Sequence, residues 1–498
     1  MSNYKKYKKY KEYKEIIKNY SYALFVMSFD EATICPKKDK ENSLNVQNYF
    51  QREIIKIVTS DEYFNLLKEL SVASDIDIVD KEAINKEIED LEKSRRIPNE
   101  LRFKGMDIIN KSSLTWEEAR ETLDYKPFLG NLGDLVNYYK DVIDCLKGKY
   151  QGYDVLLDDM EDDFTQKMYD EFFDSLKREV LPLMKKILAL PKKYNEKLKD
   201  VKFDIDKQKK LTKKVCELMG YDDNVGYIGE TIHPFTNGIN INDVRTTTRY
   251  DESLLFSNLY SVMHEVGHAL YELGLDPKYN ETSLSGGTSC AVHESQSRFY
   301  ENYLGRSKEF IYAIYPLLSE VFNEELKGFT KEDIYYYCND VCAQFTRTEA
   351  DELTYPFHVL IRYEIEKKLF NNEITVMDIE NEFNKLMDEY LGIKPSNMLE
   401  GCFQDVHWSS GFGYFPTYAL GSAMSAQIYS AMRKDLDVDN LMSNLDFMPI
   451  NNWLKEKIHK YGRSMKNLDV IKNACGEDFD SKYYIEYLKN KFNDIYNL

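Results

Sequence analysis

The chain has 498 residues, of which 43% are hydrophobic and 30% are charged, and its 66 Lys and Arg against 85 Asp and Glu give a formal charge of −19. This composition is typical of a globular protein with a sizeable core and excludes a disordered or collagen-like chain. The negative charge argues against partners such as nucleic acid or an anionic membrane surface, since binding to both depends on clusters of Lys and Arg.

The first predicted element is a helix at the N-terminus, where lysines alternate with tyrosines placed at every third position. This spacing favours an amphipathic helix with tyrosines on a buried stripe and lysines in solvent over a nucleic-acid or membrane-binding arm. No apolar segment follows the basic start, and the eight cysteines are scattered without a CxxC pair. We therefore predict a cytoplasmic protein without a secretory signal. The residues of this helix are Tyr4, Tyr7, Tyr10 and Tyr13 with Lys5, Lys6, Lys8, Lys9, Lys11 and Lys14.

Residues 1–225 are predicted to be almost entirely helical, because apolar residues recur at spacings of three and four and prolines are rare. Thr115 to Glu118 fit a capping box that would open one of these helices. Residues 226–250 differ: Asn237-Gly238 is a turn signal, and the flanking Ile, Val and Thr residues favour a small sheet of two or three strands.

The next predicted helix begins near Asp251 to Ser253 and ends near Gly274. It carries two of only seven histidines in the chain, in the sequence His264-Glu265-Val266-Gly267-His268. By composition, a chance HExxH in so histidine-poor a chain has odds of about one in a hundred. Residues four apart lie on one helical face, so both imidazoles can bind one zinc ion while Glu265 reaches a water molecule at the metal.

A catalytic zinc site needs a third protein ligand, and the segment Thr288 to Arg298 offers two candidates. We predict Glu294, because a carboxylate completes a His₂Glu site and leaves one position for water. His293 is the alternative ligand, and it could instead hydrogen-bond to a ligand without binding the metal itself. A helix whose histidines have no metal role is the simpler alternative to the whole site.

Between residues 230 and 425 the chain carries several motifs that resemble those of a known family, in the same order. The sequence resembles the carboxypeptidase Taq family of zinc metallocarboxypeptidases, with Thr346 in place of the family's Ile. The matching segments are His233-Pro234-Phe235, Asp243-Val244-Arg245-Thr246-Thr247, HExxH at 264–268, His293-Glu294-Ser295-Gln296, Thr346-Arg347-Thr348-Glu349-Ala350-Asp351, Gly401 to Trp408 and Phe412 to Gly421.

The resemblance implies a mainly α, bilobed zinc-peptidase fold with a long central groove, in addition to the small sheet near residues 226–250. It implies one metallocarboxypeptidase domain over 1–498, in which helices of 1–225 form a lobe and groove wall, 226–425 carry the catalytic motifs and 426–498 are C-terminal helices. It also implies a homodimer that releases single residues from the C-termini of peptides with broad specificity.

The resemblance also suggests substrate-binding residues. Arg347 is predicted to clamp the terminal carboxylate, since a guanidinium offers two parallel hydrogen bonds, and its alternative is a surface ion pair with Glu349 or Asp351. His407 is predicted to aid this clamp, and both His407 and Tyr418 are candidate donors to the oxyanion. His233 lines the groove or fixes its loop.

Two further segments have simple interpretations. Ile361 to Glu366, which includes Arg362, is most simply a solvated, charge-paired helix face. Trp408 to Met432 is uncharged and of membrane-spanning length, but its many small and polar residues favour chain buried inside the protein.

Three functions remain open from the sequence. The first is a metallocarboxypeptidase that uses one divalent metal, zinc before cobalt or manganese, with Glu265 as general base. The second is an endo-acting oligopeptidase of related helical architecture, which would not need Arg347 as a clamp. The third is a non-catalytic peptide-binding protein, against which Glu265 argues, because a structural zinc site needs no base between its histidines.

Overall fold

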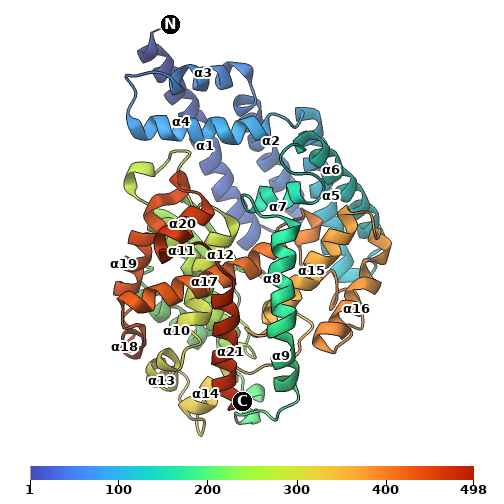
Figure 1. The fold of residues 1–498 in the computed structure, drawn as a ribbon, viewed down its shortest axis with the longest axis vertical. Coiled ribbons are helices and arrows are strands. Elements are labelled where there is room, and N and C mark those ends of the chain that lie inside the picture. The colour runs from blue at the N-terminus through green and yellow to red at the C-terminus, as the bar shows by residue number, and fades with distance from the viewer. Residues whose placement is uncertain (1) are drawn as a thin grey trace.

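Helices dominate the computed structural model, which describes residues 2–498, as the apolar spacing predicted (Figure 1). The N-terminal half consists of α1 (Asn3–Thr33), α2 (Lys40–Val58), α3 (Asp61–Ser71), α4 (Ile78–Ser94), α5 (Asn99–Thr122), α6 (Lys126–Leu146), α7 (Asp154–Met160), α8 (Gln166–Glu179), α9 (Leu181–Leu188) and α10 (Ile205–Met219).

The second half begins with the sheet and continues with further helices. Its elements are β1 (Gly226–Glu230), β2 (Thr236–Asn240), β3 (Asp243–Thr248), α11 (Leu255–Leu273), α12 (Cys290–Arg298), the π-helix η4 (Phe299–Leu304), α13 (Lys308–Val321), α14 (Lys331–Cys338), the 3₁₀ turn η5 (Arg347–Glu349), α15 (Tyr355–Phe370), α16 (Ile379–Leu391), the 3₁₀ turn η7 (His407–Ser409), α17 (Phe415–Asp435), α18 (Val438–Ser443), α19 (Met448–Lys457), α20 (Asn467–Cys475) and α21 (Lys482–Tyr496).

The basic helix α1 packs on α3 and α4 at the N-terminal end of the molecule (Figure 1). Tyr10 is buried as predicted, whereas Tyr4 is exposed. Several lysines do not simply face solvent: Lys6 pairs with Glu69, and Lys11 with Asp80. The acidic helices α3 and α4 therefore complement the charge of this face, which was predicted to be amphipathic rather than a binding arm.

The predicted sheet is present, with strand order β1-β3-β2, β3 parallel to β1 and antiparallel to β2. The predicted turn at Asn237-Gly238 is wrong, since both residues lie within β2 and the chain turns after Asn240. A Cβ atom on Gly238 would lie 3.3 Å from the Val244 side chain, so close packing accounts for this glycine.

The predicted helix cap at Thr115 is also wrong. Helix α5 continues through this residue, and Thr115 Oγ1 donates to the Lys111 carbonyl.

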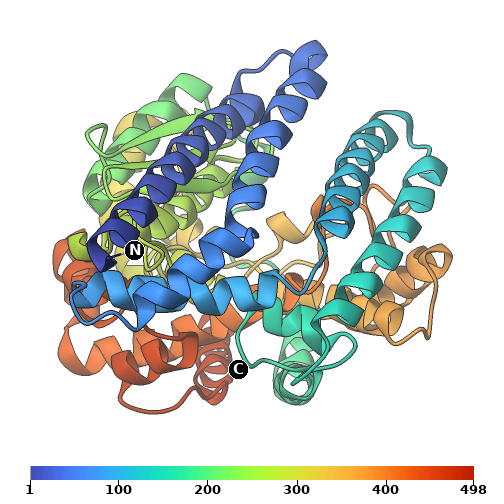
Figure 2. The same ribbon diagram turned by 90° about the horizontal axis from the view of Figure 1, so that it is seen from above.

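Two lobes flank a long groove of about 1720 Å³. Viewed from above, α1 to α4 stand over one side and α5 and α6 over the other (Figure 2). The residues that line the groove come from both sides and from its floor, among them Lys93 of α4, Arg120 of α5, His264 of α11 and Tyr418 of α17. The predicted bilobed helical fold with a central groove is confirmed.

The floor of the groove rests on two buried helices, α15 and α17, which pack against each other. The prediction that residues 408–432 are buried is confirmed, since most of α17 is buried. No helix within residues 2–498 is both long and apolar enough to cross a membrane. The predicted solvated face at 361–366 is wrong: Arg362 and Glu366 are fully buried, because α17 and α16 cover α15.

Candidate metal centre

Two histidines of α11 face the groove one helical turn apart. The apolar face of α11 packs on β3 and α12, which leaves His264 and His268 on the face that lines the cavity. Their ring centroids are 4.9 Å apart. Gly267 allows α12 to approach, since a Cβ atom there would lie only 2.8 Å from Ser297 Cα. The sequence therefore folds so that a second helix passes directly beside both imidazoles.

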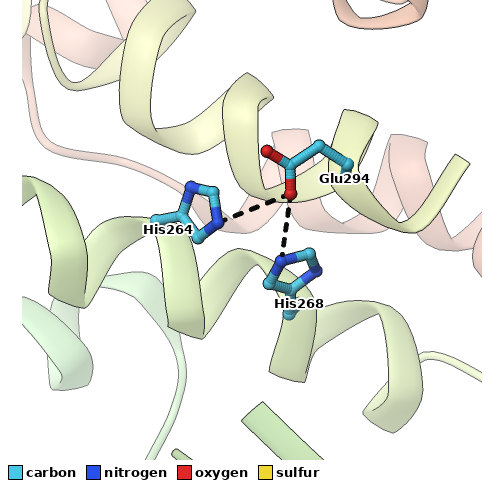
Figure 3. Close-up of side chains that lie close together, drawn as sticks. All are labelled: His264, His268 and Glu294. Atoms are coloured by element: carbon cyan, nitrogen blue, oxygen red, sulfur yellow. Dashed lines mark ion pairs between the residues drawn. The ribbon is translucent and has the colours of Figure 1, made fainter. Parts of the chain in front are cut away.

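Glu294 of α12 completes a cluster with these two histidines (Figure 3). Its Oε2 atom lies 3.5 Å from His264 Nε2 and 3.4 Å from His268 Nε2. Donors bound at about 2.0–2.2 Å to a tetrahedral metal lie about 3.3–3.6 Å apart, so these distances fit one divalent ion. The structure thus brings the three predicted ligands together, and within residues 2–498 they are the only such group of three.

His264 and Glu294 are both held by a charged network on their far side. His264 Nδ1 lies 2.9 Å from Glu301 Oε2, and Arg298 donates to Glu294 Oε1 at 2.7 Å and to Glu301 at 3.0 Å. Glu301 lies in the π-helix η4, a wider turn that is frequent at functional sites. Burial alone would raise the pKa of Glu301, but Arg298 and His264 lower it to about 2, so this carboxylate stays charged.

His268 is held by the alternative ligand, His293. His268 Nδ1 lies 2.6 Å from His293 Nδ1, and His293 Nε2 lies 2.8 Å from Glu272 Oε1. If His268 presents its Nε2 lone pair to a cation, its Nδ1 must donate to His293, whose Nε2 then donates to Glu272. The chain Glu272–His293–His268 therefore fixes one tautomer of each ring, and His293 supports a ligand rather than joining the cluster.

Glu265 lies between the two histidines and lines the same cavity. Its carboxylate accepts a hydrogen bond of 2.7 Å from the Thr236 hydroxyl on β2. Burial raises the pKa of Glu265, which makes its carboxylate a stronger base than a solvated one. The small sheet thus orients the only carboxylate between the two imidazoles.

The N-terminus of α12 is fixed by Glu161, a fully buried residue that follows α7. Glu161 accepts hydrogen bonds from Ser289 Oγ at 2.8 Å, from the Ala291 amide at 2.9 Å and from Asn467 Nδ2 at 2.7 Å. Burial raises the pKa of Glu161 to about 7. This one side chain therefore ties the first turn of the Glu294 helix to two distant segments.

Arg347 lines the groove but is only 5% exposed. Its Nη2 donates to Asp405 Oδ1 at 2.9 Å, and its Nη1 donates to the Tyr355 hydroxyl at 3.1 Å. The Tyr355 ring also lies 4.0 Å from the guanidinium carbon of Arg298. Tyr355 therefore links the predicted clamp to the network behind Glu294.

Asp405 is shared by two arginines. Its Oδ2 also accepts a hydrogen bond of 2.7 Å from Arg362 Nε. Burial alone would raise the pKa of Asp405, but the guanidinium groups of Arg347 and Arg362 hold it far below its usual range. The alternative interpretation of Arg347, a surface ion pair, does not describe this buried arrangement.

The other predicted substrate-binding residues surround this group. Tyr418 and His233 line the groove, and the Tyr418 ring lies 4.8 Å from the guanidinium carbon of Arg347. His407 lies behind Tyr418, with Nε2 2.8 Å from the Tyr418 hydroxyl, and is not among the groove-lining residues. Burial and the charge of Arg347 lower the pKa of His407 to about 3, so the ring is neutral.

Several side chains that hold the cluster were missed from the sequence. Arg298 and Glu301 lie four and seven residues after Glu294, and this helical spacing could have indicated both. Glu272 lies four residues after His268 and could have been found in the same way. Thr236 and Tyr355 gave no such signal, because they reach the site only through tertiary packing. Asp405 lies in the matched segment Gly401 to Trp408, but no role was predicted for it.

Comparison with known proteins gives consistent matches over the whole chain. The family model described as carboxypeptidase Taq (M32) metallopeptidase matches residues 9–492. Carboxypeptidase 1 of Bacillus subtilis is 38% identical over 486 residues, which cover 97% of each chain. Thermostable carboxypeptidase 1 of Pyrococcus furiosus is 36% identical over 403 residues, 80% of this chain and 81% of that protein.

Solved structures agree with the sequence matches. A crystal structure of BsuCP matches with a TM-score of 0.93 at 38% identity, over 98% of this chain and 99% of the BsuCP chain. The M32 carboxypeptidase of Deinococcus radiodurans has a TM-score of 0.93 at 28% identity, with 99% and 100% covered. The fold is therefore shared over nearly the full length of each chain compared.

Proposed function

The chain belongs to the carboxypeptidase Taq (M32) family of metallopeptidases, and from this membership and the geometry of the groove we propose that it removes single residues from the C-termini of peptides. The observation that carries the proposal is the convergence of His264, His268 and Glu294 at the floor of the groove, with Glu265 between the histidines. The family supports hydrolysis of peptides, and the geometry supports roles for individual residues.

We propose that His264, His268 and Glu294 hold one divalent metal ion, zinc in preference to cobalt or manganese. Two imidazole nitrogens and one carboxylate oxygen are the donor set typical of catalytic zinc. When bound, the metal supplies Lewis acidity, which polarises a carbonyl group and makes water more acidic. The fixed tautomers of His264 and His268 keep both Nε2 atoms directed at the same point.

We propose that Glu265 is the general base. It takes a proton from the attacking water and delivers it to the leaving amine. Its raised pKa supports this assignment because it makes the carboxylate more basic, and the hydrogen bond from Thr236 supports it because it holds the carboxylate in position. Tyr418, oriented by His407, is the candidate donor to the developing oxyanion.

We propose that Arg347 binds the terminal carboxylate. Asp405 and Tyr355 hold its guanidinium beside the groove, and N–H groups on Nη1 and Nη2 remain for a ligand. His233 lines the groove from the loop between β1 and β2 and is a candidate contact to the peptide.

Three further parts of the proposal rest on the family: broad side-chain specificity, a homodimer and a single domain over residues 1–498. A place in the cytoplasm is proposed from the scattered cysteines, which form no CxxC pair. Light scattering at several protein concentrations measures the proposed dimer directly.

The alternative, an endo-acting oligopeptidase, shares the metal chemistry but needs no clamp. We expect kcat/KM for a peptide with a free C-terminus to exceed that for its C-terminal amide by at least about 30-fold, since a buried, unmet charge costs about 2–5 kcal/mol. In Arg347→Ala this preference should collapse. Equal hydrolysis of acid and amide by the wild-type protein would favour the endopeptidase.

A further inference from the structure

The predicted clamp, Arg347, belongs to a buried triad with Asp405 and Arg362. Arg362 is 1% exposed and does not line the groove, so no peptide can touch it directly. Its Nε donates to Asp405, its Nη1 donates to the His358 carbonyl at 2.8 Å, and its Nη2 has no partner. Arg362 is therefore an incompletely paired cation beneath the substrate site.

The charges of the triad do not cancel. Two guanidinium groups share one carboxylate, which leaves one net positive charge. Within residues 2–498 no other charged side chain bonds to any of the three. The nearby rings do not add charge or remove it, because burial lowers the pKa of His358 and of His407 and keeps both neutral.

A buried net charge is costly unless an opposite charge meets it. The only member of the triad whose guanidinium borders the groove is Arg347. If Asp405 paired with Arg347 alone, this pair would be neutral and would attract a carboxylate weakly. Arg362 Nε donates to Asp405 Oδ2 at 2.7 Å, closer than the 3.2 Å from Arg347 Nε to the same oxygen. Because the two arginines share this carboxylate, part of the positive charge on Arg347 remains available to a ligand.

We propose that Arg362 is a positioning residue that sets the preference of the site for peptides with a free C-terminal carboxylate. It acts through Asp405, by pairing with a carboxylate that would otherwise neutralise Arg347. The substrate carboxylate then becomes the fourth charge of a balanced group of two cations and two anions. This inference rests on the proposed function, in which Arg347 faces the terminal carboxylate.

The test measures binding rather than turnover, in the metal-loaded Glu265→Gln protein, which is expected not to consume its ligand. Calorimetry gives Kd for one tripeptide with a free C-terminus and for its C-terminal amide, and the readout is the ratio of the two. We expect Arg362→Met in this background to reduce the preference for the acid by at least about tenfold, since it removes the net charge of the triad.

The decisive variant is the double substitution Arg362→Met with Asp405→Asn. It removes one positive and one negative charge, so Arg347 again carries a net charge, and we expect the preference to return to within about threefold of the background. A merely structural role for Arg362 predicts the opposite, a further loss in the double variant. Arg433→Met is the matched control, since Arg433 pairs with Asp439 outside the groove and should leave the preference unchanged.

Each outcome decides the inference. A preference that survives Arg362→Met, or a double variant that prefers the acid less than the single variant does, overturns the role of Arg362 alone. Equal affinity for acid and amide in the background protein overturns the proposed clamp and this inference with it. If Arg362→Met does not fold, as judged by its thermal midpoint, Arg362→Gln removes the charge while keeping a donor for Asp405 and carries the same expectation.

Discussion

At the scale of single residues, each group at the proposed metal site is oriented by a second side chain. Glu301 contacts His264, His293 contacts His268, and Arg298 contacts Glu294. Such partners fix the ring orientation and the tautomer, so that little reorganisation is needed when a cation binds. The precision of the cluster therefore depends on residues that would not themselves touch the metal.

His293→Ala should weaken metal binding by about 10–100-fold, because His268 loses the partner that fixes its tautomer. Competition with a fluorescent zinc chelator measures this affinity without any substrate. His459→Ala is the control: it removes a buried histidine whose 2.9 Å hydrogen bond goes to Gln296 and not to a proposed ligand. Unchanged zinc affinity in His293→Ala would contradict the proposed support of His268.

The residues that could be predicted from the sequence are those whose chemistry is encoded by local spacing. His264, Glu265 and His268 follow from helical periodicity, whereas the need for a third donor left both Glu294 and His293 as candidates. Arg362 could not be placed, because its pattern of charges on a helix is the same whether the face is solvated or covered. Only the packing of α17 and α16 on α15 decides between these two.

At the scale of elements, the site depends on how closely α12 approaches its neighbours. Gly267 of α11 and Gly421 of α17 lie on opposite sides of it, and a Cβ atom on Gly421 would lie 2.7 Å from the Cβ of Glu294. Two glycines thus let the Glu294 helix sit between the histidine helix and the buried helix α17. This explains why a glycine follows Val266 within the HExxH segment.

Gly267→Ala should separate α11 from α12, because the added methyl group would meet backbone atoms of Ser297 and Gln296 at 2.8 and 2.9 Å. We expect a loss of about 1–3 kcal/mol in the free energy of unfolding and a weaker affinity for zinc. Gly130→Ala in α6 is the matched control, since it has open space and should be neutral or stabilising. The prediction fails if both variants behave alike.

The buried carboxyl group of Glu161 leads to a prediction about how the stability of the protein depends on pH. Its pKa is about 7 in the folded protein and near 4.5 when unfolded, so the folded state binds this proton more tightly between the two values. Its contribution to stability is full below about pH 4.5 and is lost as the pH rises through about 7, at no more than about 1.4 kcal/mol per pH unit.

Glu161→Gln removes this titration. The unfolding midpoints of the wild-type and variant proteins, measured with the same excess of zinc at pH 5 and at pH 7.5, should therefore differ in their pH dependence. The wild-type protein should lose more stability between these two pH values than the variant does. Identical pH dependence in both proteins would show that Glu161 keeps an ordinary pKa.

At the scale of the whole molecule, the groove is built from segments far apart in the chain. Trp116 of α5 donates to the Phe403 carbonyl, and Glu161 contacts Asn467. The helical class, the small sheet and the buried segment at 408–432 could be predicted, because they follow from local periodicity and composition. The bilobed shape came only from the family resemblance, since apolar spacing does not say which helices meet.

The basic N-terminal helix forms ion pairs within the molecule. The acidic helices α3 and α4 pair with the lysines of α1, so the basic N-terminal run is used within the molecule. Ion pairs within the molecule thus give this strongly basic segment of a chain of net charge −19 a structural role. The predicted pattern of buried tyrosines and solvated lysines is only partly present, since Tyr10 is buried, Tyr4 is exposed and several of the lysines form ion pairs.

The central claim is that one metal ion at His264, His268 and Glu294, with Glu265 as base, drives release of residues from the C-terminus. Its most direct test is a time course of one unblocked peptide followed by mass spectrometry, with and without a chelator. We predict a ladder of products shortened one residue at a time from the C-terminus, abolished by the chelator and by Glu265→Gln and restored by zinc only in the wild-type protein. Internal cleavage, or a ladder that persists in the chelator or in Glu265→Gln, would contradict the account.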